Sequence, residues 1–108
     1  MKNVVIINHD QMGHGDVELG QKLLNSFLGE MSRRDGLEAV VLYNSGVKLM
    51  AKDSPFLGLF HQLIESGVDV LPCGTCVAHY QIELGVGQVT DMPTIARAVD
   101  QATKAITI

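Results

Sequence analysis

The sequence has no tryptophan, few aromatic residues and no long apolar run. Aromatic residues make up 5% of the 108 residues and apolar residues 46%, a composition typical of an aliphatic globular domain rather than a disordered segment. The apolar stretches are only a few residues long, whereas a membrane-spanning helix needs roughly 20. We therefore expect a single domain over residues 1–108 that does not cross a membrane.

The chain also lacks a cluster of basic residues. Eight lysines and arginines stand against twelve aspartates and glutamates, for a formal net charge of -4, and the basic residues are scattered. Because nonspecific nucleic-acid binding needs a basic face that neutralises phosphates, we expect no nucleic-acid partner. No apolar segment with a cleavage site follows Lys2, so no signal peptide is predicted and the expected location is cytoplasmic.

Short apolar runs alternate along the chain with segments of helical spacing. The runs predict strands at residues 4–7, 39–43, 68–71, 86–89 and 105–108. Apolar residues three and four apart, together with capping residues, predict helices from Asp16 to about Met31, from Ser54 to Gly67, from Gly74 to about Leu84 and from Asp91 to about Ala102. A short helical turn is expected over 47–51.

Strands that alternate with helices are expected to pair in parallel, because each helix is the connection that parallel strands require. Right-handed crossovers then place helices on both faces. We predict a three-layer α/β/α fold with a five-stranded, doubly wound parallel sheet in the flavodoxin-like order 2-1-3-4-5. The first and third strands would meet at the switch point, where such sheets bind ligands. The loops expected there cover 8–15, 44–46 and 72–76.

The two cysteines form the motif Cys73-Gly74-Thr75-Cys76 at a predicted junction between strand and helix. Free N–H groups and the helix dipole favour an anion in a first helical turn. On this reasoning Cys76 is a reactive thiol with a lowered pKa, and Gly74 keeps the approach to the sulfur open. Two small, buried and inert cysteines are the alternative interpretation.

Three chemistries suit two thiols at this spacing: thiol-disulfide exchange, zinc binding, and transfer of sulfur or selenium through a persulfide. The motif is similar to that of thioredoxin, but there it follows an early strand and here it follows the third predicted strand. A structural zinc site needs four ligands, and the histidines are not spaced to complete one. We therefore expect no metal.

Two other loops supply polar candidates for a pocket beside the thiols. A histidine of the first loop could exchange a proton with a thiol or stabilise a thiolate. The glycines of that loop resemble a phosphate-binding turn, but Glu18 stands where a dinucleotide fingerprint requires glycine, so no cofactor is expected. Lys48 could add positive potential, and His79 and Tyr80 could approach the pocket. The candidate pocket residues are Asn8, Asp10, Met12, Gly13, His14, Asn44, Ser45, Gly46, Gly74 and Thr75.

Several of these segments, in this order, resemble a known family. The segments are Val4 to Asn8, Met12 to Gly20, Tyr43 to Leu49, Cys73 to Cys76 and Ile106 to Ile108. Together they resemble the DsrE/DsrF-like domain of the YedF family, which is described as sulfurtransferase-like and is associated with selenium metabolism. The resemblance covers essentially the whole chain.

The resemblance implies a doubly wound fold related to sulfur-relay subunits, and homo-oligomers that are often trimers or hexamers. In the wider family a cysteine after the third strand carries the sulfur. By position this role falls on Cys73, with Cys76 as the second thiol, whereas the helix dipole favours Cys76. The resemblance also implies that sulfur-donor and sulfur-acceptor proteins are partners. YedF proteins commonly have an additional N-terminal domain with its own cysteine motif, so either a partner module or a stand-alone form is expected.

One feature of many relatives is missing. An Arg-Gly pair follows the cysteine in those proteins, whereas Tyr80 and Gln81 stand near this position here, so no specific acceptor interaction carries over. Three hypotheses therefore stand: a sulfur or selenium carrier in which Cys73 holds a persulfide and Cys76 resolves it or assists, a redox pair that cycles through a disulfide, and a noncatalytic assembly subunit that binds a small ligand.

Overall fold

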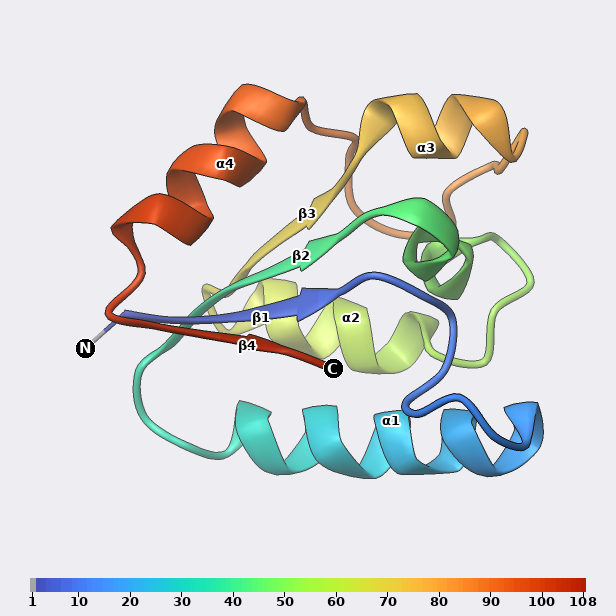
Figure 1. The fold of residues 1–108 in the computed structure, drawn as a ribbon, viewed down its shortest axis with the longest axis horizontal. Helices are drawn as coiled ribbons and strands as arrows, with labels where there is room; N and C mark the ends of the chain where they lie inside the picture. Colours follow the sequence, from blue (N-terminus) through green and yellow to red (C-terminus); the bar gives the residue numbers. More distant parts are fainter. Residues whose placement is uncertain (1) are drawn as a thin grey trace.

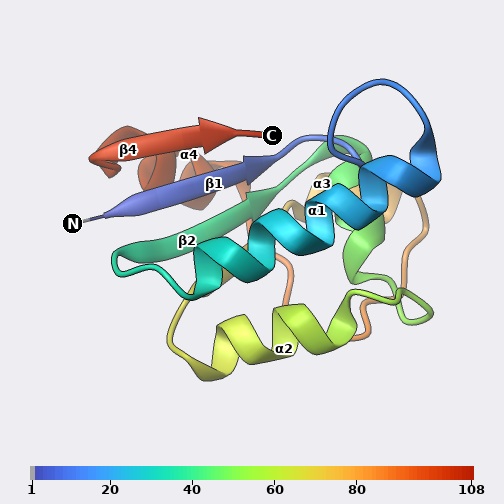
Figure 2. The same cartoon turned by 90° about the horizontal axis from the view of Figure 1, so that it is seen from below.

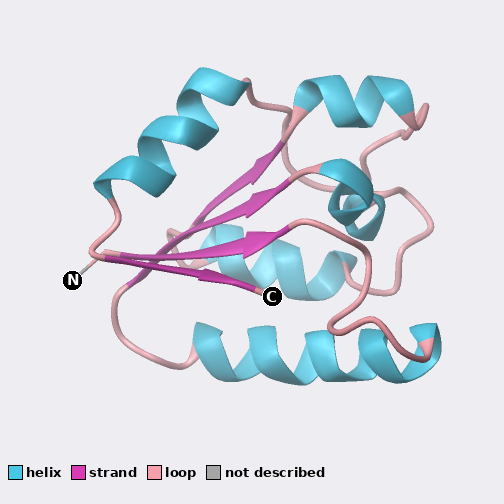
Figure 3. Ribbon diagram, in the orientation of Figure 1, coloured by secondary structure: helices cyan, strands magenta, loops and turns pink. Residues whose placement is uncertain are grey.

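The computed structural model describes residues 2–108 and forms a parallel sheet with helices on both faces (Figure 1). The strands are β1 (Asn3–Ile7), β2 (Leu37–Leu42), β3 (Asp69–Pro72) and β4 (Lys104–Thr107). The helices are α1 (Val17–Ser32), α2 (Leu57–Glu65), α3 (Gly74–His79) and α4 (Met92–Gln101), with a 3₁₀ helix, η1 (Asn44–Met50), after β2 (Figure 3). No helix in the described part of the chain is long and apolar enough to cross a membrane.

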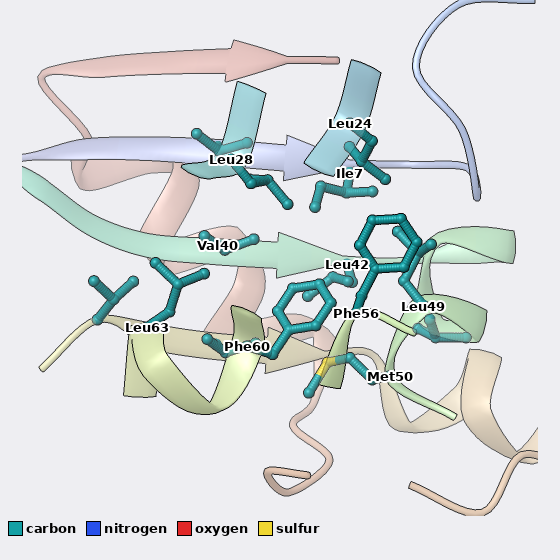
Figure 4. Close-up of a cluster of buried hydrophobic side chains, with 14 of the residues drawn as sticks. Ile7, Leu24, Leu28, Val40, Leu42, Leu49, Met50, Phe56, Phe60 and Leu63 are labelled. Atoms are coloured by element: carbon teal, nitrogen blue, oxygen red, sulfur yellow. The ribbon is translucent and has the colours of Figure 1, made fainter. Parts of the chain in front are cut away.

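Both faces of β1 and of most of β2 are buried, which explains the apolar runs at residues 4–7 and 39–42 within them. On one face, Ile7, Val40 and Leu42 pack against α1, α2 and η1 (Figure 4). On the other face, alternate residues including Ile6 and Val41 pack against Ile95 of α4. The core is therefore two layers of side chains divided by the sheet, with α1 and α4 on opposite sides (Figure 1).

The strand order differs from the prediction. The sheet has four strands in the order β3-β2-β1-β4, so the predicted five-stranded order 2-1-3-4-5 is corrected, while the parallel α/β class is confirmed. The chain passes from β1 to β2 to β3 in one direction (Figure 1), and then crosses over to place β4 on the free side of β1 (Figure 2). The reversal therefore lies between β1 and β4, and β2 separates β1 from β3.

Residues 86–89, predicted as a strand, lie outside any strand. Gly87 has a φ of 73°, in the left-handed region that interrupts extended backbone and favours glycine. The residues that flank the segment form isolated bridges, Leu84 with Ala51 and Thr90 with Cys73. It thus reaches the end of β3 without adding a strand to the sheet.

The ends of two helices follow the sequence closely. Asp16 and Asp91 accept main-chain N–H hydrogen bonds at 2.7 and 2.9 Å in the first turns of α1 and α4, as their capping role predicts. In contrast, α3 ends at His79 rather than near Leu84. Gln81 has a φ of 55°, a left-handed conformation that stops the helix from continuing.

Candidate thiol site

The carboxyl ends of two neighbouring strands bring the candidate residues together. Cys73 directly follows β3, and its N–H donates to the carbonyl oxygen of Leu42, the last residue of β2, at 2.9 Å. Asn44 begins η1 just beyond the same end of β2. Since α3 starts at Gly74 and packs beside η1 (Figure 1), Cys76 in the first turn of α3 lies next to Asn44.

The two thiols differ in access to solvent. Cys73 is 3% exposed and packs on the α4 face of the sheet with Ile6 and Val41. Cys76 is half-buried and lines a pocket of about 350 Å³. The pocket is lined by Tyr43, Asn44, Thr75, Cys76, His79, Tyr80 and Met92. Both cysteines are free thiols, and only the second faces this pocket.

The two thiols also differ in acidity. Burial raises the pKa of Cys73, but hydrogen bonds to its sulfur from the N–H and thiol of Cys76 and from the N–H and hydroxyl of Thr75 outweigh this effect and lower the pKa. Burial and the bond to Cys73 raise the pKa of Cys76, and the N–H of Asn44 only partly offsets them. The two pKa shifts therefore run opposite to the expectation from the helix dipole, which favoured Cys76, because the Cys76 thiol donates to its neighbour.

A chain of contacts leads from the Cys76 sulfur to η1 and the end of α3. The N–H of Asn44 donates to the Cys76 sulfur at 3.1 Å, and the Tyr80 hydroxyl donates to the Asn44 side-chain oxygen at 2.7 Å. The Lys48 ammonium lies 4.5 Å from the centre of the Tyr80 ring. Asn44, whose N–H bonds the sulfur, has a left-handed backbone conformation with a φ of 51°.

Among the candidate pocket residues, Asn44 and Thr75 lie beside the cysteines. Gly74 serves close packing, since a Cβ there would lie 3.1 Å from the Thr90 carbonyl oxygen. Gly46 lies under the end of β1, where a Cβ would come within 2.5 Å of the Ile7 carbonyl oxygen. Ser45, between Asn44 and Gly46, is partly exposed and does not line the pocket.

The structure does not bring the first loop to this pocket. Since β2 lies between β1 and β3, the loop after β1 is one strand further from the thiols than the predicted order implied. The loop instead contacts α1 and itself. Gln21 of α1 donates to the Asp10 carbonyl oxygen at 3.3 Å, and the His9 and His14 rings stack with their centres 5.0 Å apart. The candidates that do not line the pocket are Asn8, Asp10, Met12, Gly13 and His14.

Sequence reasoning missed Tyr43 and Met92. Tyr43 follows β2 directly and could have been found as the residue where a buried strand meets the predicted binding edge. Met92 begins α4 and is 52% exposed. No spacing in the sequence relates it to the thiols, because its position depends on the path of the segment after α3. His79 and Tyr80 do line the pocket.

This arrangement supplies sulfur chemistry from the chain itself. The lowered pKa of Cys73 favours its thiolate, which is the nucleophilic form, and the second thiol donates a hydrogen bond to this sulfur. Such a pair can attack an electrophilic sulfur atom or exchange one between the two thiols. Within residues 2–108, no group of three or more histidine, cysteine, aspartate or glutamate side chains is arranged to hold a metal ion.

Comparisons with known proteins agree with the fold. The YchN protein from E. coli aligns over 100% of both chains with a TM-score of 0.69 and 19% identity. MTH1491 from Methanobacterium thermoautotrophicum, described as a protein of unknown function, aligns over 100% of both chains with a TM-score of 0.71 and 24% identity. A comparison with curated protein sequences found no match. The model of the DsrE/DsrF-like family matches residues 2–108, so this chain belongs to the DsrE/DsrF-like family, which is linked to sulfur relay.

Proposed function

We propose that this protein carries sulfur as a persulfide on Cys73. The observation that carries the proposal is the position of this cysteine directly after β3, where its sulfur accepts hydrogen bonds that lower its pKa. Membership of a family linked to sulfur relay supports the same chemistry. The burial of Cys73 favours storage of sulfur, since a persulfide away from solvent is protected from competing thiols.

Loading is a thiol exchange at sulfur. The Cys73 thiolate attacks the outer sulfur of a donor persulfide, an S–S bond to Cys73 forms, and the bond from that sulfur to the donor breaks. The electron pair leaves on the donor sulfur as a thiolate, and the outer sulfur keeps its proton. Discharge transfers the same outer sulfur to a thiolate with the same balance of bonds, so the cycle needs no oxidant or reductant.

The partners follow from this cycle. A donor protein presents a persulfide and an acceptor protein presents a thiolate, and the carrier works between them in the cytoplasm as a homo-oligomer. Selenium is a second cargo of the same chemical class, as the YedF-like motifs suggest, because a selenium atom can bond to the Cys73 sulfur in the same way. An enzymatic step is not required of a carrier.

Intact mass spectrometry after treatment with inorganic polysulfide tests this proposal. We expect wild type and Cys76→Ser to gain sulfur that cyanide and dithiothreitol remove, and Cys73→Ser to gain none that survives removal of free polysulfide. The serine at 76 keeps a donor for the Cys73 sulfur, so this variant is the matched control. A wild-type protein that gains no removable sulfur contradicts the carrier function.

A second function is favoured by the hydrogen bond from the Cys76 thiol to the Cys73 sulfur, which brings the two sulfurs together. Two thiols in contact, one acting as an anion, can cycle as a disulfide. Trapping of free thiols across a series of glutathione potentials separates the two functions. A redox protein forms the internal disulfide within the cellular range of potentials, whereas a carrier does not need to form it.

A further inference from the structure

We propose that sulfur passes between Cys73 and a partner thiol by way of Cys76, and that Tyr80, acting through Asn44, is the residue that positions Cys76 for this transfer. The inference rests on the proposed function, because it concerns the route of the same sulfur atom. In this route Cys76 is the thiol that exchanges sulfur with partner thiols, and Tyr80 is a positioning residue.

Access to the two sulfurs is the first step of this inference. Cys73 is 3% exposed and is enclosed between the sheet and Ile95 of α4. Cys76 lines the pocket of about 350 Å³, which opens to solvent between the end of β2 and α3. A partner thiol carried on a peptide or a protein can enter this pocket, but it meets Cys76 before it reaches Cys73.

The transfer balances without a further reactant. Cys76 first gives up its thiol proton to solvent in the pocket. Its thiolate then attacks the outer sulfur of the Cys73 persulfide, and a new S–S bond joins that sulfur to Cys76. The S–S bond to Cys73 breaks, and its electron pair stays on the Cys73 sulfur as a thiolate. The proton moves with the outer sulfur, so Cys73–S–SH and Cys76–S⁻ become Cys73–S⁻ and Cys76–S–SH. A partner thiolate then takes the same sulfur and releases Cys76 as a thiolate.

In both transfer steps the Cys76 sulfur is a thiolate at one point, and Asn44 stabilises that negative charge with a hydrogen bond. Its main-chain N–H points at this sulfur at 3.1 Å. Asn44 itself is held in a left-handed backbone conformation, with a φ of 51°, and such a conformation needs support from its surroundings. The hydrogen bond of 2.7 Å from Tyr80 to the Asn44 side chain supplies this support, and Lys48 over the ring holds the tyrosine.

The acidities of the two thiols suit the direction from Cys73 to Cys76. A thiol of lower pKa is the better leaving group, and a thiolate of higher pKa is the stronger nucleophile. Cys73 has the lowered pKa, because hydrogen bonds from Thr75 and Cys76 outweigh its burial, and Cys76 has the raised one, mainly through burial. The lowered pKa therefore makes the Cys73 sulfur a good leaving group when its persulfide is attacked.

Two acceptors of different size test the route through Cys76. Wild type and Cys76→Ser are loaded with inorganic polysulfide, freed of excess reagent, and discharged with cyanide or with glutathione. We expect both proteins to hold sulfur on Cys73 and to lose it to cyanide, which is small enough to reach a buried sulfur. Discharge by glutathione is expected to be at least about tenfold slower in Cys76→Ser, because the thiol that passes the sulfur outward is missing.

The outcomes separate the route from the carrier function. Equal rates of discharge by glutathione in the two loaded proteins overturn the route and leave the carrier function standing. Absence of loading on Cys73 overturns the carrier function itself. Release of sulfide from wild type together with an internal disulfide also overturns the route, because Cys76 then attacks the inner sulfur of the persulfide rather than the outer one.

Tyr80→Phe tests the positioning role, since it removes the hydroxyl and keeps the ring under Lys48. We expect unchanged loading of Cys73, glutathione discharge that is slower by about fivefold, as for the loss of one hydrogen bond, and a shift of the pH profile of discharge to higher pH. Ser66→Ala is the control, because it also removes a hydroxyl bond, of 2.8 Å to the Leu63 carbonyl oxygen, at the far end of α2. A pH profile that matches wild type overturns the positioning role of Tyr80.

Discussion

Cys73 and Cys76 stand close in the sequence, but their sulfurs have different surroundings. The sulfur of Cys73 accepts several hydrogen bonds, which lower its pKa despite burial, whereas the thiol of Cys76 acts mainly as a donor. This difference arises from individual main-chain N–H groups and from one hydroxyl, that of Thr75. No spacing rule for the motif contains these contacts, so the sequence alone left open which cysteine leads.

Thr75→Val tests the acidity of Cys73 at the level of a single group. Valine keeps the shape of threonine and removes the hydroxyl that donates to the Cys73 sulfur, so the pKa of Cys73 is expected to rise toward that of an ordinary thiol. At neutral pH the thiolate fraction and the rate of alkylation of Cys73 then fall. The rate of alkylation of Cys73 is measured across pH in Cys76→Ser and in the double variant Thr75→Val/Cys76→Ser. Superimposable pH profiles of the two proteins contradict the hydrogen bond from Thr75.

Gly46 shows how a single residue connects the site to the core. A Cβ at this position would lie 2.5 Å from the Ile7 carbonyl oxygen, which belongs to backbone that cannot move freely. Gly46→Ala is therefore expected to lower the free energy of unfolding by about 1–3 kcal/mol. Denaturant unfolding measures this change.

Gly58→Ala is the matched control for Gly46→Ala. Gly58 lies within α2, and a Cβ there meets nothing within 4 Å. Because alanine is the better helix former, this variant is expected to gain about 0.5–1 kcal/mol. Equal effects of the two substitutions would show that close packing at Gly46 has no energetic consequence.

At the scale of elements, the sequence predicted most of what the structure contains. Short apolar runs located the four strands of the described chain, and the capping aspartates located the starts of α1 and α4. The errors fall where conformation is decided by single residues with positive φ. Gly87 interrupts the segment that looked like a strand, and Gln81 ends α3 early. Glutamine carries no composition signal for a left-handed conformation, so this end of the helix was not predictable.

The cap of α4 gives a prediction for this scale. Hydrogen bonds from the side chain and N–H of Thr94 lower the pKa of Asp91. Since the folded-state pKa lies below the unfolded one, the cap stabilises the protein above the unfolded-state pKa, and the stabilisation is lost as pH falls through the folded-state value. Asp91→Ala is expected to melt at a lower temperature than wild type near neutral pH, with a difference that shrinks in acid. A difference independent of pH would contradict the charged cap.

At the scale of the whole molecule, the order of strands decided which predicted residues meet. The α/β class and parallel pairing follow from the alternation of elements, but the order of strands depends on which sheet edge accepts each new strand, which local sequence does not encode. With β2 between β1 and β3, the loop after β1 is not brought to the pocket, whereas Asn44 lies beside Cys76. Two of the three predicted loops therefore supply the site.

The architecture also explains why the two thiols can differ. Cys73 lies where β3 passes into α3 and is covered by the layer that contains α4, while Cys76 faces outward between α3 and the end of β2. A buried thiol that can hold sulfur and an accessible thiol that can exchange it thus lie next to each other at one edge of the sheet. This separation is the basis of the proposed carrier.

Site-resolved mass spectrometry of the polysulfide-treated protein tests the carrier most directly. The treated chain is alkylated, digested and searched for the extra sulfur on each of the two cysteines in wild type, Cys73→Ser and Cys76→Ser. The account predicts removable sulfur on Cys73 in wild type and in Cys76→Ser, and none in Cys73→Ser. Two results would contradict this account. One is Cys73→Ser with as much removable sulfur, now on Cys76, as wild type carries, and the other is a wild type that takes up no removable sulfur.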